Sequence, residues 1–305
     1  MVREAPFPRL WARPPPLTSA AGSGVDLRTS PSEPVRTTNP RGRPPRPGRR
    51  RRRASYACET GQRPSTIVNF CSLMVLDSRE AVLANLARVR AGIARACERS
   101  GRDPGEVRLV AASKAVSAEA VRWAHEDGIE DFGENYVREL EAKREAVRGP
   151  RWHFIGTLQS HTAHRVADLA DVVQTLAPGS AVGRLSRRAA QRGRRIPALI
   201  EVDFTGGRTG VAPQRCVDFA DEVSAMDGLD LRGLMTLPPM PQVPEETRPW
   251  FIRLRELLAE VKATHPRAEE LSMGMSMDYE VAVEEGATMV RVGTALFGER
   301  PPAGT

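Results

Sequence analysis

Apolar and polar positions follow a helical spacing in the first well-patterned stretch of the chain, residues 79–99. Val82, Leu86, Val89 and Ile93 recur every three to four residues, and charged residues fill many of the positions between them. This spacing places the apolar side chains on one face of a helix. We therefore predict an amphipathic helix over 79–99.

Short apolar segments and helical stretches then alternate to the end of the chain. The predicted strands are 107–113, 129–132, 152–155, 171–175, 197–203, 229–235, 270–272 and 288–292. The predicted helices between them are 117–127, 135–147, 159–169, 180–192, 213–226, 245–264 and 278–285. The strands are mostly apolar throughout, which is typical of parallel strands buried on both faces.

A strand–helix unit repeated about eight times over about 230 residues predicts a single α/β domain, a (β/α)8 TIM barrel. The alternative is an open, doubly wound sheet. No Gly-x-Gly-x-x-Gly follows the first strand, and no Gly-x-x-x-x-Gly-Lys-Ser/Thr occurs in the chain. The sequence therefore lacks the motifs typical of dinucleotide sites and of P-loop nucleotide sites.

The first 73 residues have a different composition. They hold 12 of the 25 prolines and 14 arginines but no lysine and only 4 acidic residues, a balance of +10. Such a segment buries too little apolar surface to offset its ordering entropy, so we expect a disordered extension over 1–73 and a barrel domain over 74–305. An upstream start assigned in error, with Met74 as the native start, would explain this prefix. The alternatives are a basic nucleic-acid-binding arm and an Arg-rich targeting peptide.

Outside this extension the charges nearly balance, with 31 basic and 34 acidic residues. The main body therefore gives no reason to expect nucleic-acid binding. Cys58, Cys71, Cys97 and Cys216 lack metal-ligand spacing and are too few for a disulfide scaffold. Together with the lack of an apolar run of about 18 residues, these features predict a cytoplasmic protein without a metal site or a membrane span.

A single lysine, Lys114, follows the first apolar strand, and a helix-forming stretch begins directly after it. The C-terminal ends of strands carry the chemistry in α/β folds. A lysine held at such a position can form a Schiff base, because its pKa falls readily on burial. The alternative is a surface lysine that merely ends a strand.

Small and hydroxyl-bearing residues gather in the last two loops, at 272–276 and at Gly293 and Thr294. Backbone N–H groups at helix N-termini bind phosphate, and the loops after strands 7 and 8 of a barrel often form such a site. Ordinary N-capping by Ser276 and Thr294 would explain either loop alone. The two loops together, opposite Lys114, predict a phosphorylated carbonyl ligand, and pyridoxal 5′-phosphate (PLP) is the candidate.

Arg291 lies on the last predicted strand, close to these two loops. An acidic residue beside the pyridine nitrogen of PLP makes the ring a strong electron sink, whereas a permanently charged arginine does the reverse. Arg291 therefore favours PLP binding or limited proton transfer over aminotransferase chemistry. A salt bridge between Arg291 and a nearby carboxylate is the alternative.

Six segments in this order resemble the PLP homeostasis protein family, relatives of the barrel domain of alanine racemase. They are Val-Ala-Ala-Ser-Lys at 110–114, Phe-Gly-Glu-Asn-Tyr at 132–136, Trp-His-Phe-Ile-Gly at 152–156 with Leu-Gln-Ser at 158–160, Gly-Leu-Met-Thr at 233–236, Leu-Ser-Met-Gly-Met-Ser at 271–276, and Val-Arg-Val-Gly-Thr-Ala-Leu-Phe-Gly at 290–298. The similarity spans roughly residues 76–300.

This resemblance implies a PLP-binding barrel of fold type III in which Lys114 is the Schiff-base lysine. Ser276, Gly293 and Thr294 would hold the phosphate, and Arg291 would face the pyridine nitrogen.

The resemblance also implies that Asn135 lies beside the cofactor and that Met235 and Met273 line the pocket. Members of the family have no established catalytic turnover and are thought to carry or buffer PLP, so PLP-dependent apo-enzymes are the expected partners. Family analogy suggests a monomer. A PLP-dependent amino-acid racemase of low activity is the alternative, although a chain ending at Thr305 leaves no room for the second domain of alanine racemase.

Overall fold

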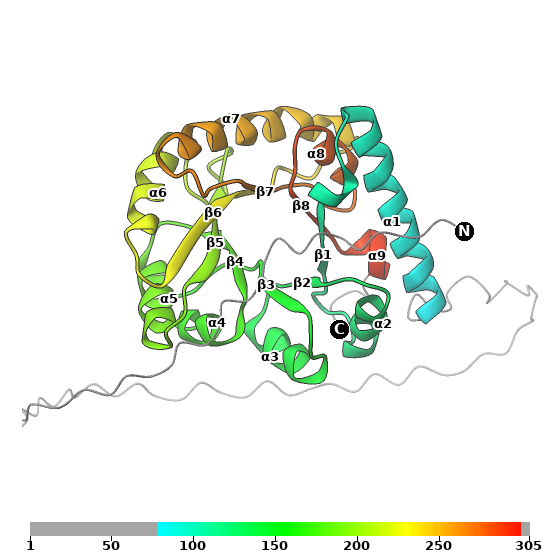
Figure 1. Cartoon of the computed structure of the whole chain (residues 1–305), viewed down its shortest axis with the longest axis horizontal. Coiled ribbons are helices and arrows are strands. Elements are labelled where there is room, and N and C mark those ends of the chain that lie inside the picture. Colours follow the sequence, from blue (N-terminus) through cyan, green and yellow to red (C-terminus); the bar gives the residue numbers. More distant parts are fainter. Residues whose placement is uncertain (1–77, 300–305) are drawn as a thin grey trace, which may run out of the picture. The chain divides into compact units, whose positions relative to one another are not determined.

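The computed structural model describes residues 78–299, which belong to one compact unit. Eight parallel strands close into a barrel in chain order, and helices form a ring around it (Figure 1). The predicted (β/α)8 TIM barrel is thus confirmed, and the open doubly wound sheet is wrong. The predicted extension over 1–73 and the start at Met74 lie outside the described residues.

The elements have the following bounds. The strands are β1 (Arg108–Ala112), β2 (Asp131–Glu134), β3 (Arg151–Phe154), β4 (Val172–Leu176), β5 (Ile196–Val202), β6 (Leu229–Thr236), β7 (Glu270–Ser272) and β8 (Met289–Val292). The α-helices are α1 (Arg79–Ser100), α2 (Ala118–Glu126), α3 (Val137–Ala146), α4 (Ala163–Leu169), α5 (Ser180–Gln191), α6 (Cys216–Ser224), α7 (Arg248–Thr264), α8 (Tyr279–Glu284) and α9 (Thr294–Phe297). Short 3₁₀ turns, η2 (Pro104–Glu106), η3 (Pro213–Arg215) and η4 (Pro244–Thr247), precede β1, α6 and α7.

Helix α1 precedes the barrel repeat and packs against α2, α8 and α9. The hydroxyl of Ser78 accepts a hydrogen bond from the N–H of Ala81 and caps its N-terminus, while Gly101 ends the helix with a left-handed φ of 67°. The buried face carries Val82, Leu86 and Val89, as the helical spacing predicted. Among residues 78–299, none of the helices combines the length and the apolar character that a membrane crossing needs.

Strand β2 is the clearest departure from the sequence-based boundaries, which had placed it at 129–132. Gly133 and Glu134 continue the strand and pair with His153 and Phe154 of β3. A glycine followed by a glutamate indicates a loop in isolation, but hydrogen bonding to strands on both sides overrides that local preference. This extension places Glu134 at the C-terminal end of β2.

Two apolar layers stabilise the barrel. The larger lies between strands and helices and includes Phe132 and Trp152, whose ring centroids are 5.6 Å apart. A smaller cluster inside the barrel consists of Val110, Val172, Leu199, Met235 and Met289. Inward-facing polar residues occupy much of the remaining interior, although branched apolar residues usually fill a barrel core. These buried polar residues lead to the candidate site.

Candidate functional site

The turn that carries Lys114 directly follows β1. Pairing of β1 with β8 sets Val110 opposite Arg291, and its pairing with β2 sets Ala112 opposite Gly133. The C-terminal ends of these neighbouring strands therefore lie together at one mouth of the barrel. Partly buried Lys114 directs its Nζ atom toward the ring of Tyr136, 5.2 Å from the ring centroid.

Lys114 differs in its surroundings from the two other lysines of the chain, Lys143 and Lys262. The ammonium of Lys262 is paired with Glu269 at 2.8 Å on the outer helix layer. Lys143 is buried and paired with two carboxylates. Within the described part of the chain, Lys114 alone among the lysines faces an aromatic ring at the mouth instead of a carboxylate partner, which leaves its amine the best placed to meet a carbonyl ligand.

A buried charged network lies beside the Lys114 turn. Lys143 Nζ of α3 donates to Glu134 Oε1 at 2.7 Å, to Glu139 Oε2 at 2.9 Å and to the carbonyl oxygen of Ser113 at 2.5 Å. The hydroxyl of Ser113 donates to Glu134 Oε1 at 2.7 Å, and the N–H of Ala115 donates to Glu139 Oε2 at 2.7 Å. The backbone on both sides of Lys114 is thus bonded to side chains of α3.

The two loops with small and hydroxyl residues meet as predicted. The hydroxyl oxygen of Ser276 accepts the N–H groups of Gly293 at 3.3 Å and of Ala295 at 3.1 Å, and exposed Thr294 begins α9 between them. Gly274 has a φ of 88°, and a Cβ atom there would lie 2.5 Å from the Cβ of Ala282. A glycine is therefore needed for the loop to turn back beneath α8.

Arg291 is buried inside the barrel and held at two points. Its Nη1 donates to Ser272 Oγ at 2.5 Å, and its Nη2 donates to the carbonyl oxygen of Thr236 at 2.8 Å. These partners are a hydroxyl and a carbonyl, so the salt bridge considered from the sequence is not the arrangement found. Burial lowers the pKa of Arg291 to about 10, which leaves it charged at neutral pH.

The contact between Arg291 and Ser272 begins a chain of hydrogen bonds across the barrel interior. Ser272 Oγ donates to Gln174 Oε1 at 2.6 Å, and Gln174 Nε2 lies 2.7 Å from His153 Nδ1. His153 Nε2 lies 2.7 Å from Asp131 Oδ1, which also accepts from Arg151 Nε at 2.5 Å. All members except Arg151 are buried. We call these six residues, from Arg291 to Arg151, the interior chain.

Every bond in the interior chain has a fixed direction, because a guanidinium donates and never accepts. Ser272 must accept from Arg291, so its hydroxyl hydrogen goes to Gln174 Oε1. The amide nitrogen of Gln174 then donates to His153 Nδ1, which assigns the neutral Nε2–H tautomer to His153. Burial opposes the charge on Asp131, but hydrogen bonds from Arg151 and His153 hold the pKa of that carboxyl well below its usual range.

The remaining predicted residues lie in different environments. Asn135 is partly buried at the end of β2, where the backbone of Gly156 packs so closely that a Cβ atom there would lie 2.1 Å from the carbonyl oxygen of Asn135. Met235 lies in the cluster inside the barrel. Met273, by contrast, is fully buried in the layer between barrel and helices. The sequence predicts that Met273 lines the pocket, whereas its side chain packs in the layer between barrel and helices.

Sequence reasoning did not identify several residues that hold this site. Gln174 is a polar residue within an otherwise mostly apolar strand, a signal that indicates an inward-facing hydrogen-bonding group. Glu139 and Lys143 have the spacing of an ion pair on one helix face, which is also common on solvent-exposed helices. Their role depends on the turn that they contact, and local spacing does not reveal that contact.

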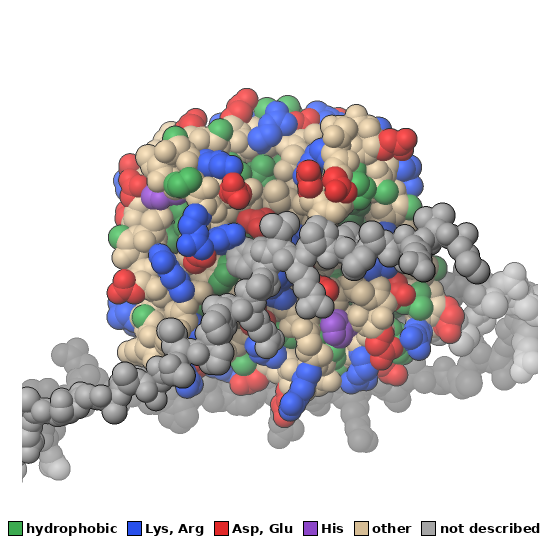
Figure 2. Space-filling model, in the orientation of Figure 1, with side chains coloured by type: hydrophobic (Ala, Val, Ile, Leu, Met, Phe, Trp, Pro, Cys, Tyr) green, Lys and Arg blue, Asp and Glu red, His purple; other side chains and the backbone are tan. Residues whose placement is uncertain are grey.

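Two adjoining clefts of about 360 Å³ each open beside the loops that follow β3, β4 and β5, and both are lined by Pro178 and Thr209. None of the eight predicted site residues lines them. Basic and acidic side chains are interspersed over the face visible in Figure 2, without a continuous stripe of one sign. Among residues 78–299, no cluster of His, Cys, Asp and Glu has the arrangement of a metal site.

Comparison with known proteins adds independent findings. The family model described as alanine racemase, N-terminal domain, matches residues 84–301. A pyridoxal phosphate homeostasis protein of Aquifex aeolicus is 39% identical over 220 residues, which cover 70% of this chain and 96% of the relative. The Pseudomonas aeruginosa protein of the same name is 40% identical over 226 residues, which cover 72% of this chain and 96% of the relative.

Solved structures agree with these matches. PipY of Synechococcus elongatus, whose structure was determined with PLP bound, is 33% identical, with a TM-score of 0.64 that covers 71% of this chain and all of that one. Alanine racemase of Clostridium difficile is 14% identical, with a TM-score of 0.60, and the match covers 73% of this chain and 58% of the racemase. The second similarity shows a shared fold alone.

Proposed function

This chain belongs to the family of the pyridoxal phosphate homeostasis proteins, and we propose that it holds PLP as a Schiff base of Lys114 without catalytic turnover. The observation that carries the proposal is the convergence of Lys114, Arg291 and the Ser276 loop at the ends of neighbouring strands. The relatives that match over nearly their whole length are named for PLP homeostasis and not for an enzymatic reaction.

The donors present fit the three polar parts of PLP. When bound, PLP supplies an electrophilic aldehyde on a ring that can withdraw electrons. Lys114 supplies the amine for that aldehyde. Ser276 accepts the N–H groups of Gly293 and Ala295, so its own hydrogen remains available to a phosphate. The phosphate would also accept the N–H of Thr294 and would share the N–H of Gly293 with Ser276.

The chemistry of Arg291 favours PLP binding over catalytic turnover. Two of its N–H groups are used by Ser272 and Thr236, and others remain to donate to the pyridine nitrogen. Because arginine keeps its proton at neutral pH, the pyridine nitrogen would accept a hydrogen bond without becoming protonated, and the ring would remain a weak electron sink.

The remaining site residues complete the proposal. Asn135 would lie beside the ring, and Met235 would contribute an apolar wall from inside the barrel. Met273 would act indirectly, by packing beneath the Ser276 loop. The proposed partners are PLP-dependent apo-enzymes that receive the cofactor from a cytoplasmic, monomeric carrier.

Low amino-acid racemase activity is the second candidate. Its support is the family model that covers residues 84–301, since the racemase neighbours at 13–18% identity share only the fold. Incubation of the PLP-loaded protein with L-alanine, followed by chiral chromatography, tests it directly. Sustained formation of D-alanine would overturn the proposal that PLP is held without turnover.

Trapping the lysine tests the main proposal. PLP added to the full chain should produce an absorbance band at the border of the visible and near-ultraviolet, and borohydride reduction should attach the cofactor to the peptide that contains Lys114. Lys114→Ala should abolish the band and the label, whereas Lys262→Ala, on the outer helix layer, should change neither. Labelling at Lys143 or Lys262, or an unchanged band in Lys114→Ala, would refute the assignment.

A further inference from the structure

The residue after Lys114 adopts an unusual backbone conformation. Ala115 has a φ of 58° and is the one non-glycine residue with a positive φ among residues 78–299. A side chain with a Cβ atom is strained in this left-handed region, so surrounding contacts have to hold it there. The chain has an alanine at position 115, although a glycine would adopt this φ without strain.

Helix α3 supplies those contacts from both sides of Lys114. The carbonyl of Ser113 accepts a hydrogen bond of 2.5 Å from Lys143 Nζ, and the N–H of Ala115 donates one of 2.7 Å to Glu139 Oε2. Glu139 and Lys143 lie four residues apart on α3 and are themselves paired at 2.9 Å. The ion pair therefore bridges the peptide groups on either side of Lys114.

The position of the Lys143 ammonium is itself fixed by its buried neighbours. Its ammonium has three hydrogens, and its three acceptors are Ser113 O, Glu134 Oε1 and Glu139 Oε2. Glu134 is fully buried, and its second oxygen, Oε2, has no hydrogen-bond partner within the described residues. A buried carboxylate with this deficit strongly favours keeping the Lys143 ammonium beside it. Lys143 is thereby held in place and unavailable to a carbonyl ligand.

We propose that Glu139 and Lys143 are positioning residues that hold the strained Ala115 turn and thereby present the Lys114 amine to the carbonyl ligand. This inference rests on the proposed function and adds to it the reason why Lys114 reacts. Neither residue needs to touch PLP. They keep the Lys114 turn in the observed conformation, so that the amine is already oriented for reaction before the ligand binds.

Glu139→Ala tests the proposal in the full chain. Because Glu139 is partly exposed and lies on the rim of the buried network, the fold should survive its removal. We expect Schiff-base formation with PLP, followed by stopped-flow absorbance, to slow about tenfold, a factor that corresponds to about 1.4 kcal/mol. Glu141→Ala is the matched control, because Glu141 is an exposed carboxylate of the same helix that pairs with Arg165 instead.

Ala115→Gly in the Glu139→Ala background separates positioning from general stability. Glycine adopts the left-handed conformation without help, so the double variant should recover most of the lost rate. Thermal unfolding of each variant shows whether rate and stability move together. A rate unchanged by Glu139→Ala, or a reduced rate that Ala115→Gly does not improve, would overturn the inference.

Amide exchange of Ala115, followed by ¹⁵N NMR, tests the contact in the absence of PLP. The Ala115 N–H should exchange at least about fivefold faster in Glu139→Ala than in the wild-type chain, because its acceptor is removed. Unchanged exchange would contradict the proposed role of Glu139. If the wild-type chain forms no Schiff base but the exchange difference is observed, the proposed function fails while the turn is still held as described.

Discussion

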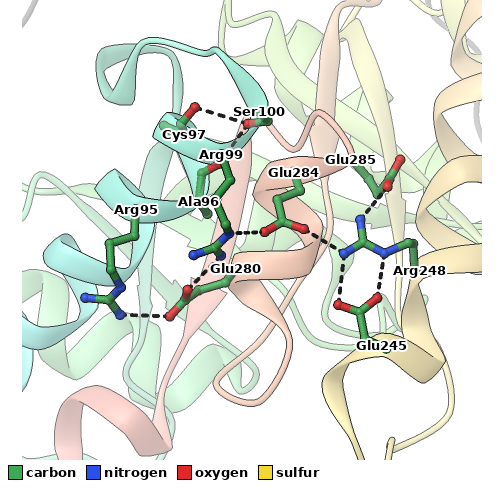
Figure 3. A network of polar contacts seen from close by, with 10 residues as sticks. All are labelled: Arg95, Ala96, Cys97, Arg99, Ser100, Glu245, Arg248, Glu280, Glu284 and Glu285. Atoms are coloured by element: carbon green, nitrogen blue, oxygen red, sulfur yellow. Dashed lines mark hydrogen bonds and ion pairs between the residues drawn. The ribbon is translucent and has the colours of Figure 1, made fainter.

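Two networks of charged and polar residues hold the β7–α8–β8 unit from opposite sides. The interior chain begins at Arg291 of β8 and crosses the barrel. The second, which we call the outer network, joins α1, α8, η4 and α7 on the outside of the barrel (Figure 3). Both rely on arginine, yet they differ in the partners of each arginine and in the solvent exposure of the side chains.

The outer network offers its two central arginines, Arg99 and Arg248, more than one carboxylate partner each. Arg248 contacts Glu245, Glu284 and Glu285, with its closest distance to each being 2.6 Å. Arg99 links α1 to Glu284 and to Glu280 of α8 (Figure 3). Many of these side chains are partly or largely exposed, and Glu245 is 65% exposed. Water and alternative carboxylates can therefore compensate when one contact is lost.

The interior chain offers no such alternatives. Gln174, His153 and Ser272 are fully buried, and each uses a donor or an acceptor that its neighbour requires. A buried group that loses its partner costs its desolvation free energy, since water does not replace the partner. On the surface, arginine side chains join helices in a way that tolerates the loss of one contact. Inside the barrel, the same kind of side chain is held in one geometry, because no contact of the interior chain has a substitute.

Cutting the interior chain at its centre should have the largest effect. Gln174→Leu leaves the Ser272 hydroxyl without its acceptor and His153 Nδ1 without its donor, so the free energy of unfolding should fall by about 2–6 kcal/mol, at roughly 1–3 kcal/mol for each orphaned group. Urea denaturation measures this change. Gln191→Leu, at the exposed end of α5, is the matched control and should stay within about 0.5 kcal/mol. An equally small effect of Gln174→Leu would remove the distinction between the two networks.

Neutralising Asp131 should have an intermediate effect that depends on pH. Asp131→Asn keeps the shape but loses the charge that pairs with Arg151, and it should cost about 1–3 kcal/mol at pH 7. Because the folded-state pKa of Asp131 lies well below its usual value, the stabilisation is fully present above the unfolded-state pKa and is lost as pH falls through the folded-state pKa. Urea denaturation between pH 3 and pH 7 should show the gap between wild type and variant narrowing toward acid pH. A gap independent of pH would mean that the charge of Asp131 does not stabilise the fold.

Removing Arg248 from the outer network should have the smallest effect. Arg248→Ala should lower the free energy of unfolding by no more than about 1 kcal/mol, because its ion pairs are partly exposed and screened by salt. At 1 M NaCl, where the Debye length is about 3 Å, the difference should shrink, whereas the cost of Gln174→Leu should stay the same. Denaturation of both variants at low and high salt measures this contrast. A cost for Arg248→Ala that matched the cost of Gln174→Leu and ignored salt would show that the outer network also depends on buried contacts.

Much of this architecture was predictable from local patterns. The alternation of apolar segments with helical spacing located all eight strands, and it missed the end of β2 because Gly133 and Glu134 have the local character of a loop. Lys114 was recognisable because a lone lysine ended an apolar strand before a helix. The Ser276 and Gly293 loops were recognisable from their composition, and the structure brings them together.

Local patterns in the chain were enough to predict the repeating strand–helix order, and with it the barrel and the end of the barrel at which Lys114 and the Ser276 loop lie. Which polar side chains meet depends instead on how the strands are arranged in space. Ser272 and Gln174 are 98 residues apart in sequence, and Arg291 and Thr236 are 55 apart. Their contacts depend on strand register and on closure of the barrel, whereas periodicity reports only which face of its own element a residue occupies. For the same reason Met273 packs outside the barrel, and Glu139 and Lys143 reach across to the turn that carries Lys114.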